Sequence, residues 1–163
     1  MKHKVEFSTA DIAQEINSGG VARSGNVELK ITRNGEVSEL KTDWVVFRYV
    51  EDGQFAAGVI HAFFGEDTGE EVPAVFFGTR RLGVGKYEIR DPFEGPHEVN
   101  AIYGLGRGES IGGDAFGKGE LVVDEFSYSP SSTSIRGSFD FDYIDRYGVA
   151  VNVKCLDFWA SRH

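Results

Sequence analysis

The sequence contains a single cysteine, Cys155, so no disulfide bond can form within the chain. A lone thiol is typical of proteins that remain in a reducing compartment. The basic start is not followed by the apolar run of about 7–15 residues that marks a signal peptide. No stretch approaches the roughly 18 apolar residues of a membrane-spanning helix. We therefore expect a cytoplasmic protein; a secreted mature chain whose signal was removed is the alternative.

Basic residues are scarce: 17 Lys and Arg stand against 26 Asp and Glu, which gives a formal net charge of −9. A chain this acidic repels phosphate backbones and anionic lipids, so we expect neither a nucleic-acid partner nor a membrane partner. Hydrophobic residues nevertheless make up 40% of the 163 residues. That fraction excludes a disordered chain and indicates one domain over residues 1–163.

Glycine and aromatic residues are abundant, with 21 glycines and 13% aromatics. This combination indicates many strands joined by tight turns. Turn signals recur about every 8–12 residues, which is typical of sandwiches and barrels. The connections are too short for parallel crossovers. We therefore predict an all-β fold, an antiparallel β-sandwich of about ten strands, with a lipocalin-like β-barrel as the alternative.

Only one short helix is predicted, over residues 8–18. Ser8 or Thr9 can cap its first turn, Ile12 and Ile16 form one apolar stripe, and Gly19-Gly20 ends it. A helix of this length is unstable alone, so it must dock on another part of the fold.

Three further patterns refine the expected sheet. Asn34-Gly35 separates two alternating segments and predicts a tight hairpin. Residues 54–64 are apolar on both faces, which predicts a central strand covered on both sides, either by the N-terminal helix or by a second subunit. The last strand changes its apolar phase near Lys154-Cys155, where we place a β-bulge.

The segment 106–118 is rich in glycine and is predicted to form one long loop. Loops of this length in compact domains are often functional, although glycine also makes ordering costly and favours disorder. The candidate binding residues in this loop are Arg107, Glu109, Ser110, Asp114 and Phe116.

A second set of candidates would line a ligand site on a sheet face or in a barrel mouth: Trp44, His61 and Tyr103. Aromatic side chains more often fill cores. His61 lies within an apolar strand, so it is either a satisfied core histidine or, in a barrel, a group that points into the lumen. An exposed tryptophan would favour the ligand-binding hypothesis.

Motifs for catalysis and metal binding are weak. Gly108-Glu109-Ser110-Ile111-Gly112 matches a nucleophile elbow, but that motif needs a strand before it and a helix after it. The four histidines show no metal-ligand spacing, and Asp140, Asp142 and Asp145 lack the remaining pattern of a calcium loop. We expect no metal, no cofactor and no catalytic residue.

One basic pair interrupts the acidic sequence, at Thr79-Arg80-Arg81. Such a pair is either a solvated turn or a site for an anion or an acidic partner.

The region 85–158 contains a succession of glycine-led strand motifs. Gly85-Lys86-Tyr87 is followed by a strand that begins at Gly119, by Gly137-Ser138-Phe139-Asp140-Phe141 and by a final hydrophobic strand. This pattern resembles small β-rich domains of unknown function in predicted bacterial lipoproteins. The resemblance implies a β-rich fold and carries no activity or residue role across. The chain departs from that group because it lacks a lipid-attachment cysteine.

These observations favour a non-catalytic protein-interaction domain that acts as a homodimer or on another protein. Complementary charge would then speed the capture of a partner. The alternative is a domain that binds a small ligand or a carbohydrate. An enzyme on a lipocalin-like barrel is the third hypothesis, and the almost wholly apolar inward faces argue against it.

Overall fold

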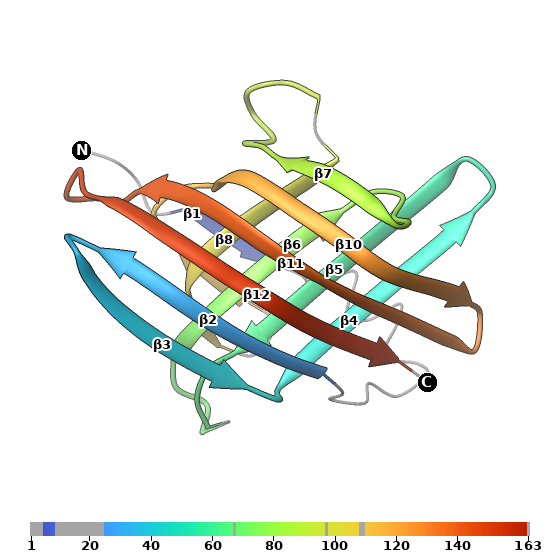
Figure 1. Cartoon of the computed structure of the whole chain (residues 1–163), viewed down its shortest axis with the longest axis horizontal. Helices are drawn as coiled ribbons and strands as arrows, with labels where there is room; N and C mark the ends of the chain where they lie inside the picture. The colour runs from blue at the N-terminus through green and yellow to red at the C-terminus, as the bar shows by residue number, and fades with distance from the viewer. Residues whose placement is uncertain (1–4, 9–24, 67, 97, 108–109, 163) are drawn as a thin grey trace.

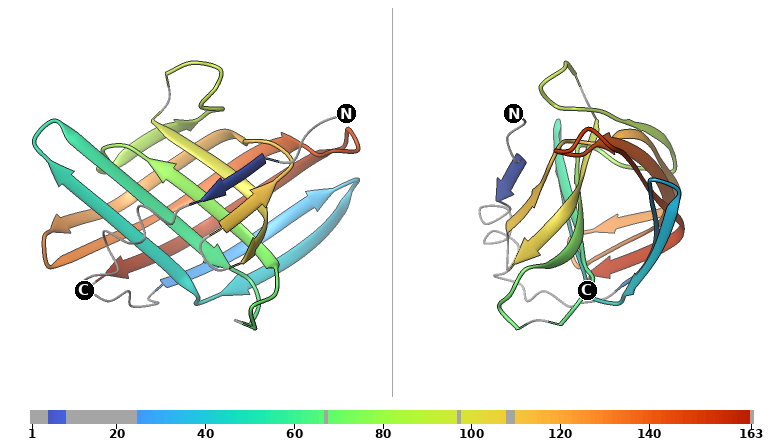
Figure 2. Two further views of the ribbon diagram at one scale, coloured as in Figure 1. Left: turned by 180° about the vertical axis from the view of Figure 1, so that it is seen from behind. Right: turned by 90° about the vertical axis from the view of Figure 1, so that its left-hand side faces the viewer.

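A computed structural model describes residues 5–8, 25–66, 68–96, 98–107 and 110–162 of the chain. These residues form one sheet that curls into a nearly closed barrel (Figures 1 and 2). The predicted all-β class is confirmed. The predicted sandwich is wrong, because the strands belong to one continuous sheet instead of forming two separate sheets. The predicted helix over 8–18 lies outside the described residues apart from Ser8, which ends the first strand.

The strands follow the alternation of the sequence closely. Their bounds are β1 Val5–Ser8, β2 Gly25–Arg33, β3 Glu36–Thr42, β4 Val45–Asp52, β5 Phe55–Phe63, β6 Val72–Thr79, β7 Gly85–Ile89, β8 Val99–Arg107, β9 Ser110–Gly113, β10 Lys118–Ser129, β11 Ser132–Ile144 and β12 Ala150–Arg162.

The strand order around the barrel is β3-β2-β12-β11-β10-β7-β8-β6-β5-β4, with β9 beside β8 and β1 beside β9. Neighbours are antiparallel, except that β7 and β8 are parallel and joined only at Ile89 and Val99. The two ends of this order approach each other, because a Cβ added at Gly25 of β2 would lie 2.7 Å from the Cβ of Val45 in β4. A glycine is therefore required where the barrel closes.

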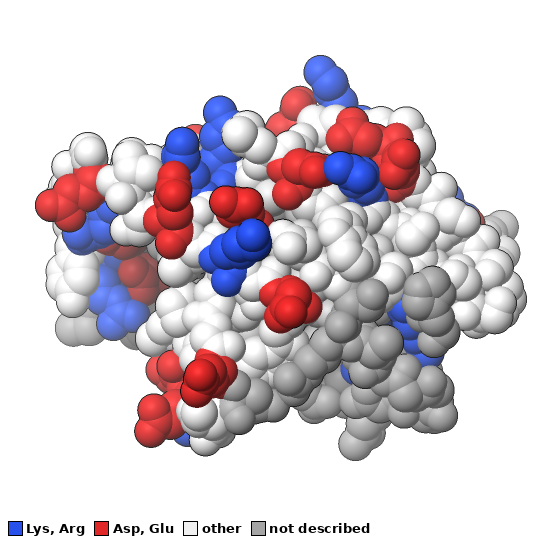
Figure 3. Space-filling model, turned by 60° about the horizontal axis from the view of Figure 1, so that its bottom comes forward, with Lys and Arg blue, Asp and Glu red and all other residues white. Residues whose placement is uncertain are grey.

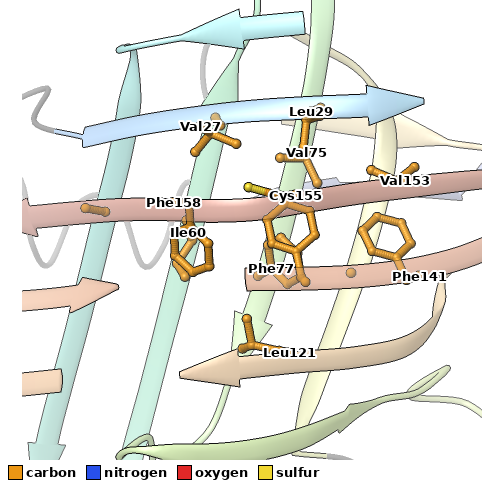
Figure 4. Packing of buried hydrophobic residues seen from close by; sticks show 14 of the residues in the cluster. Val27, Leu29, Ile60, Val75, Phe77, Leu121, Phe141, Val153, Cys155 and Phe158 are labelled. Carbon is orange, nitrogen blue, oxygen red and sulfur yellow. The ribbon is translucent and has the colours of Figure 1, made fainter. Parts of the chain in front are cut away.

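The inside of the barrel is filled by side chains from all around the sheet (Figure 4). Phe77, Phe139 and Phe158 lie against one another here, with ring centroids 4.6 Å apart for the first two and 5.6 Å apart for the last two. Cys155 faces the same core, and burial raises the pKa of its thiol to about 11. The thiol therefore stays protonated at neutral pH and fills space as a small apolar group.

A second apolar cluster lies on the outer face of β5, β6 and β8. Val59, Phe63, Phe76, Ile102 and Ile111 are all buried in it. β1 and β9 lie outside the barrel on this side (Figure 2). β5 is thus buried on both faces, as its two-sided apolar pattern predicts.

Two local predictions are confirmed. Asn34 and Gly35 both have positive φ, 53° and 75°, and connect β2 to β3 as a tight hairpin. A β-bulge in β12 falls between Lys154 and Phe158, where the pairing with β2 shifts register. The predicted long loop 106–118 is wrong in part, because β8 extends to Arg107 and the segment contains β9. β8 and β9 pair through four glycines, Gly104, Gly106, Gly112 and Gly113, and a Cβ at Gly104 or Gly113 would clash with the facing strand.

Candidate ligand-binding site at the barrel mouth

One end of the barrel is surrounded by the turn between β2 and β3, the turn between β11 and β12, and the segment that follows β9 (Figure 1, left). The filled lumen stops short of this end and leaves a cavity of about 410 Å³. That volume lies within the range of small-molecule sites, about 300–1,000 Å³. Its main lining residues are Ile31, Arg33, Tyr103, Asp114, Tyr143 and Asp145.

Strand alternation places the two tyrosines at this mouth. Tyr103 follows Val99 and Ala101 on the inner face of β8, and Tyr143 follows Phe139 and Phe141 on the inner face of β11. The two rings lie against the core, and both residues line the cavity. Neither phenol hydroxyl has a hydrogen-bond partner among the described residues. Each is therefore available to bind an acceptor atom in the cavity.

Both phenols remain protonated at neutral pH. Burial raises the pKa of Tyr103, and it raises the pKa of Tyr143 further with help from the neighbouring Tyr103 and Asp114. A phenol with a raised pKa donates a hydrogen bond and does not act as a base. The two tyrosines therefore suit the binding of an oxygen or nitrogen acceptor.

Two carboxylates at the mouth, those of Asp145 and Asp114, are already paired. Asp145 accepts hydrogen bonds from the backbone N–H groups of Tyr147, at 2.8 Å, and Val149, at 2.9 Å, and from Nε of Arg33, at 2.8 Å. The Val149 N–H and the Arg33 guanidinium lower the pKa of Asp145. Asp114 accepts from Arg146 Nε at 2.9 Å and from its backbone N–H at 3.0 Å. These pairs neutralise the rim and hold its turns in place.

The candidates from segment 106–118 do not form one site. Arg107 and Ser110 oppose each other in the β8–β9 ladder, and Glu109 lies outside the described residues. Phe116 is buried in the outer cluster, with its ring centroid 5.9 Å from that of Phe93. Asp114 is the member that reaches the mouth.

The predicted set of Trp44, His61 and Tyr103 is divided between the two faces of the sheet. His61 does not point into the lumen: it lies in the outer cluster between Phe63 and Phe76, with ring centroids 5.2 and 4.8 Å away. Burial, with help from Arg48, lowers the pKa of His61 to about 3, so the ring is neutral. Trp44 lies against Phe63 on the same outer side, at 4.6 Å. Only Tyr103 lines the mouth.

Tyr143 and Arg33 were not predicted as site residues. The inward alternation of β11 ends on Tyr143 and could have identified it, whereas nothing in the sequence near Arg33 indicates that it pairs with Asp145. Trp159 was not predicted either; it is 43% exposed and lies beside Leu156, which is 78% exposed. These two side chains line a groove of about 660 Å³ over the β12 bulge, where Asp157 accepts two hydrogen bonds from Arg136.

Among the described residues, no group of three His, Cys, Asp or Glu side chains is arranged to hold a metal ion. Asp140 and Asp142 both accept hydrogen bonds from the side-chain amide of Asn152, at 2.6 and 2.9 Å. Ser110, the serine of the elbow-like motif, lies in strand β9 and not at a strand-to-helix turn.

Charged side chains of both signs are interspersed on the face shown in Figure 3, instead of gathering in one acidic patch. The acidic excess therefore defines no broad binding surface on that face. No helix among the described residues is long and apolar enough to cross a membrane.

No family model matches the sequence, and no significant match is found among curated proteins or solved structures. The resemblance to domains of predicted bacterial lipoproteins stays a prediction.

Proposed function

We propose that the protein is a non-catalytic binding domain that holds a small, uncharged molecule in its barrel mouth. The observation that carries this proposal is the pair of Tyr103 and Tyr143 hydroxyls, which line a cavity and have no partner among the described residues. Ile31 and Val151 add apolar surface to the lining of the cavity, and Val151 lies directly opposite Tyr143 on the neighbouring strand. A ligand with an acceptor oxygen and an apolar body satisfies both parts, and a sugar ring or an alcohol has this chemistry.

The charge of the rim favours an uncharged ligand. Asp145 and Asp114 are paired with Arg33 and Arg146, so the two pairs together carry no net charge. Glu36 also lines the cavity and adds one negative charge, which disfavours anions. Tyr103 and Tyr143, whose pKa values are raised by burial, act at this site as hydrogen-bond donors and not as bases.

The test is native mass spectrometry of the protein as purified, without heating or added ligand. The wild-type chain is expected to carry a non-covalent adduct, and the double variant Tyr103→Phe/Tyr143→Phe is expected to lose it. Tyr147→Phe is the matched control, because Tyr147 is 78% exposed and is not among the lining residues. An adduct that persists in the double variant contradicts the proposal. If the wild-type chain carries no adduct, methyl glucoside and cyclohexanol are titrated into it, and binding is monitored through the amide NMR signals of residues 103 and 143. If neither compound binds at the mouth, the proposal is overturned.

Self-association is the second candidate function, and the groove over the β12 bulge favours it. Leu156 and Trp159 are exposed there, flanked by Lys30, Lys154 and Arg136 and by three acidic residues. A surface with both signs of charge can pair with a second copy of itself across a two-fold axis. The same native spectra test this function: a dimer that Leu156→Asp converts to monomer supports it, and a monomer for both chains contradicts it.

A further inference from the structure

The sheet has a gap away from the mouth, where two neighbouring strands stop together. β6 and β8 are paired up to Thr79 and Val99 and go no further in that direction. β5 pairs with β6 only from Gly58 onward, so residues 55–57 pair with β4 alone. On the other side, residues 85–88 of β7 pair with β10 alone. Two strand edges therefore carry no strand among the described residues.

Both of these edges line a single cavity of about 800 Å³. Its floor is held in place by two connections. The backbone N–H of Arg80 donates to the carbonyl of Glu98 at 3.0 Å, and the side chain of Arg81 is fixed to the β4–β5 hairpin by Glu51 and the carbonyl of Gly53. The cavity is thus a built feature of the sheet, and its lining comes from the β4–β5 hairpin, the end of β6 and the region of β7. Figure 1 labels these strands.

Arginine is concentrated at this cavity, although the whole chain has a net charge of −9: Arg80, Arg81 and Arg90 line it together with Glu88 and Glu98. Arg81 is paired with Glu51, and Arg90 lies 3.6 Å from Glu88. The guanidinium of Arg80 is exposed and forms no ion pair with the described residues. It is therefore free to bind a carboxylate of a partner.

The edge strand β3 differs from the gap. It ends the strand order, and its exposed charged side chains are two acidic residues, Glu36 and Glu39, and one basic residue, Lys41. Acidic side chains on an edge strand deter the addition of another strand, and of an acidic one above all. The gap instead combines free backbone groups with arginine and with Phe55, whose side chain is 62% exposed.

We propose that this gap binds an extended acidic peptide segment of a partner protein, which adds as a strand to residues 55–57 of β5 while its carboxylates meet Arg80 and Arg90. In strand addition, main-chain hydrogen bonds give affinity and side-chain contacts give specificity. The site lies outside the mouth and does not depend on the ligand proposed there.

The probe is a fluorescein-labelled peptide of eight residues that alternates threonine and glutamate, measured by fluorescence anisotropy. The threonine–lysine counterpart serves as the charge control. We expect the acidic peptide to bind and the basic one not to bind. Arg80→Glu should weaken binding by about tenfold, and Arg80→Lys should keep most of the affinity. Lys41→Glu on β3 changes the net charge equally and should leave the affinity unchanged, and thermal melts show whether each variant is folded.

Strand addition is separated from simple charge attraction by two measurements. An acidic peptide with alternate N-methylated residues loses the backbone N–H groups that pairing needs, and it should not bind. The amide signals of residues 55–57 should shift on titration, whereas those of residues 38–40 in β3 should not. Equal binding of both charged peptides, unchanged affinity in Arg80→Glu, or full binding of the N-methylated peptide overturns the proposal.

Discussion

Tyrosines stand at both ends of the barrel, and their hydroxyls have opposite surroundings. At the end formed by the β4–β5 hairpin, the Tyr49 hydroxyl donates to Glu51 at 2.9 Å and accepts from the backbone N–H of Leu82 at 3.0 Å. The Tyr87 hydroxyl is hydrogen-bonded to the backbone of Gly83 at 2.9 and 3.1 Å. At the mouth, Tyr103 and Tyr143 have no such partners among the described residues.

The difference lies in the connections. The short segment between β6 and β7 crosses the first end and uses its tyrosines to satisfy backbone groups, so that end is closed by the chain itself. At the mouth, the turns are held by Asp145 and Asp114 instead, which leaves the phenols unused. One end thus uses its tyrosine hydroxyls in hydrogen bonds to the chain, while the hydroxyls at the other end have no partner among the described residues.

The core between the two ends gives the largest expected effect. Phe141 is fully buried, with its ring centroid 5.9 Å from Phe77 and 6.1 Å from Phe139. Phe141→Ala should lower the free energy of unfolding by about 3–5 kcal/mol, because it leaves a cavity in the core of the barrel. Urea denaturation measures this loss. Phe55→Ala, at a site 62% exposed, should change the same quantity by less than about 0.5 kcal/mol. Similar losses in both variants would contradict the packing described for the lumen.

Removing one hydroxyl at the closed end should have the next largest effect. Tyr49→Phe leaves the buried N–H of Leu82 without its acceptor, so the free energy of unfolding should fall by about 1–3 kcal/mol. Urea denaturation at pH 7 compares it with Tyr147→Phe, which removes an exposed hydroxyl and should have no measurable effect. If the two variants were equally stable, Tyr49 would not be closing this end.

Acid should weaken the mouth through Asp145. Its pKa is lower in the folded chain than the usual value near 4, so its ionised form stabilises the fold above that pH. This stabilisation is lost as the pH falls from about 4 through the folded pKa. Asp145→Asn should therefore be less stable than wild type at pH 7 and should lose less stability between pH 5 and pH 2.5. Thermal melts across this range measure it, and parallel pH profiles would rule out the role of Asp145.

The strands could be predicted because their signals are local. Alternation marked the strands, Asn34-Gly35 marked the hairpin and the phase change marked the bulge of β12. The choice between sandwich and barrel depends on which distant strands pair, above all β2 with β12. No local pattern states that pairing, so the sequence favoured the wrong one of two architectures with the same alternation.

The site was only partly predictable for the same reason. Tyr103 and Asp114 were identified under two separate hypotheses, and the structure places both at one mouth. Arg33 joins them only because β2 pairs with β12 beside the turn that holds Asp145. The sequence left two positions open for His61, in a core or in the lumen, because its strand is apolar on both sides and alternation could not say which side is the lumen.

The smallest expected change in stability is at the mouth, and it tests whether the tyrosines at the two ends of the barrel have different roles. Tyr143→Phe removes a hydroxyl that forms no hydrogen bond with the described residues, so the free energy of unfolding should change by less than about 0.5 kcal/mol. The same variant should weaken ligand binding, because one of two donors to the ligand is lost. Urea denaturation and native mass spectrometry of one preparation measure both quantities. A loss of stability as large as that of Tyr49→Phe would mean that Tyr143 closes its end too, and the two ends would then serve the same purpose.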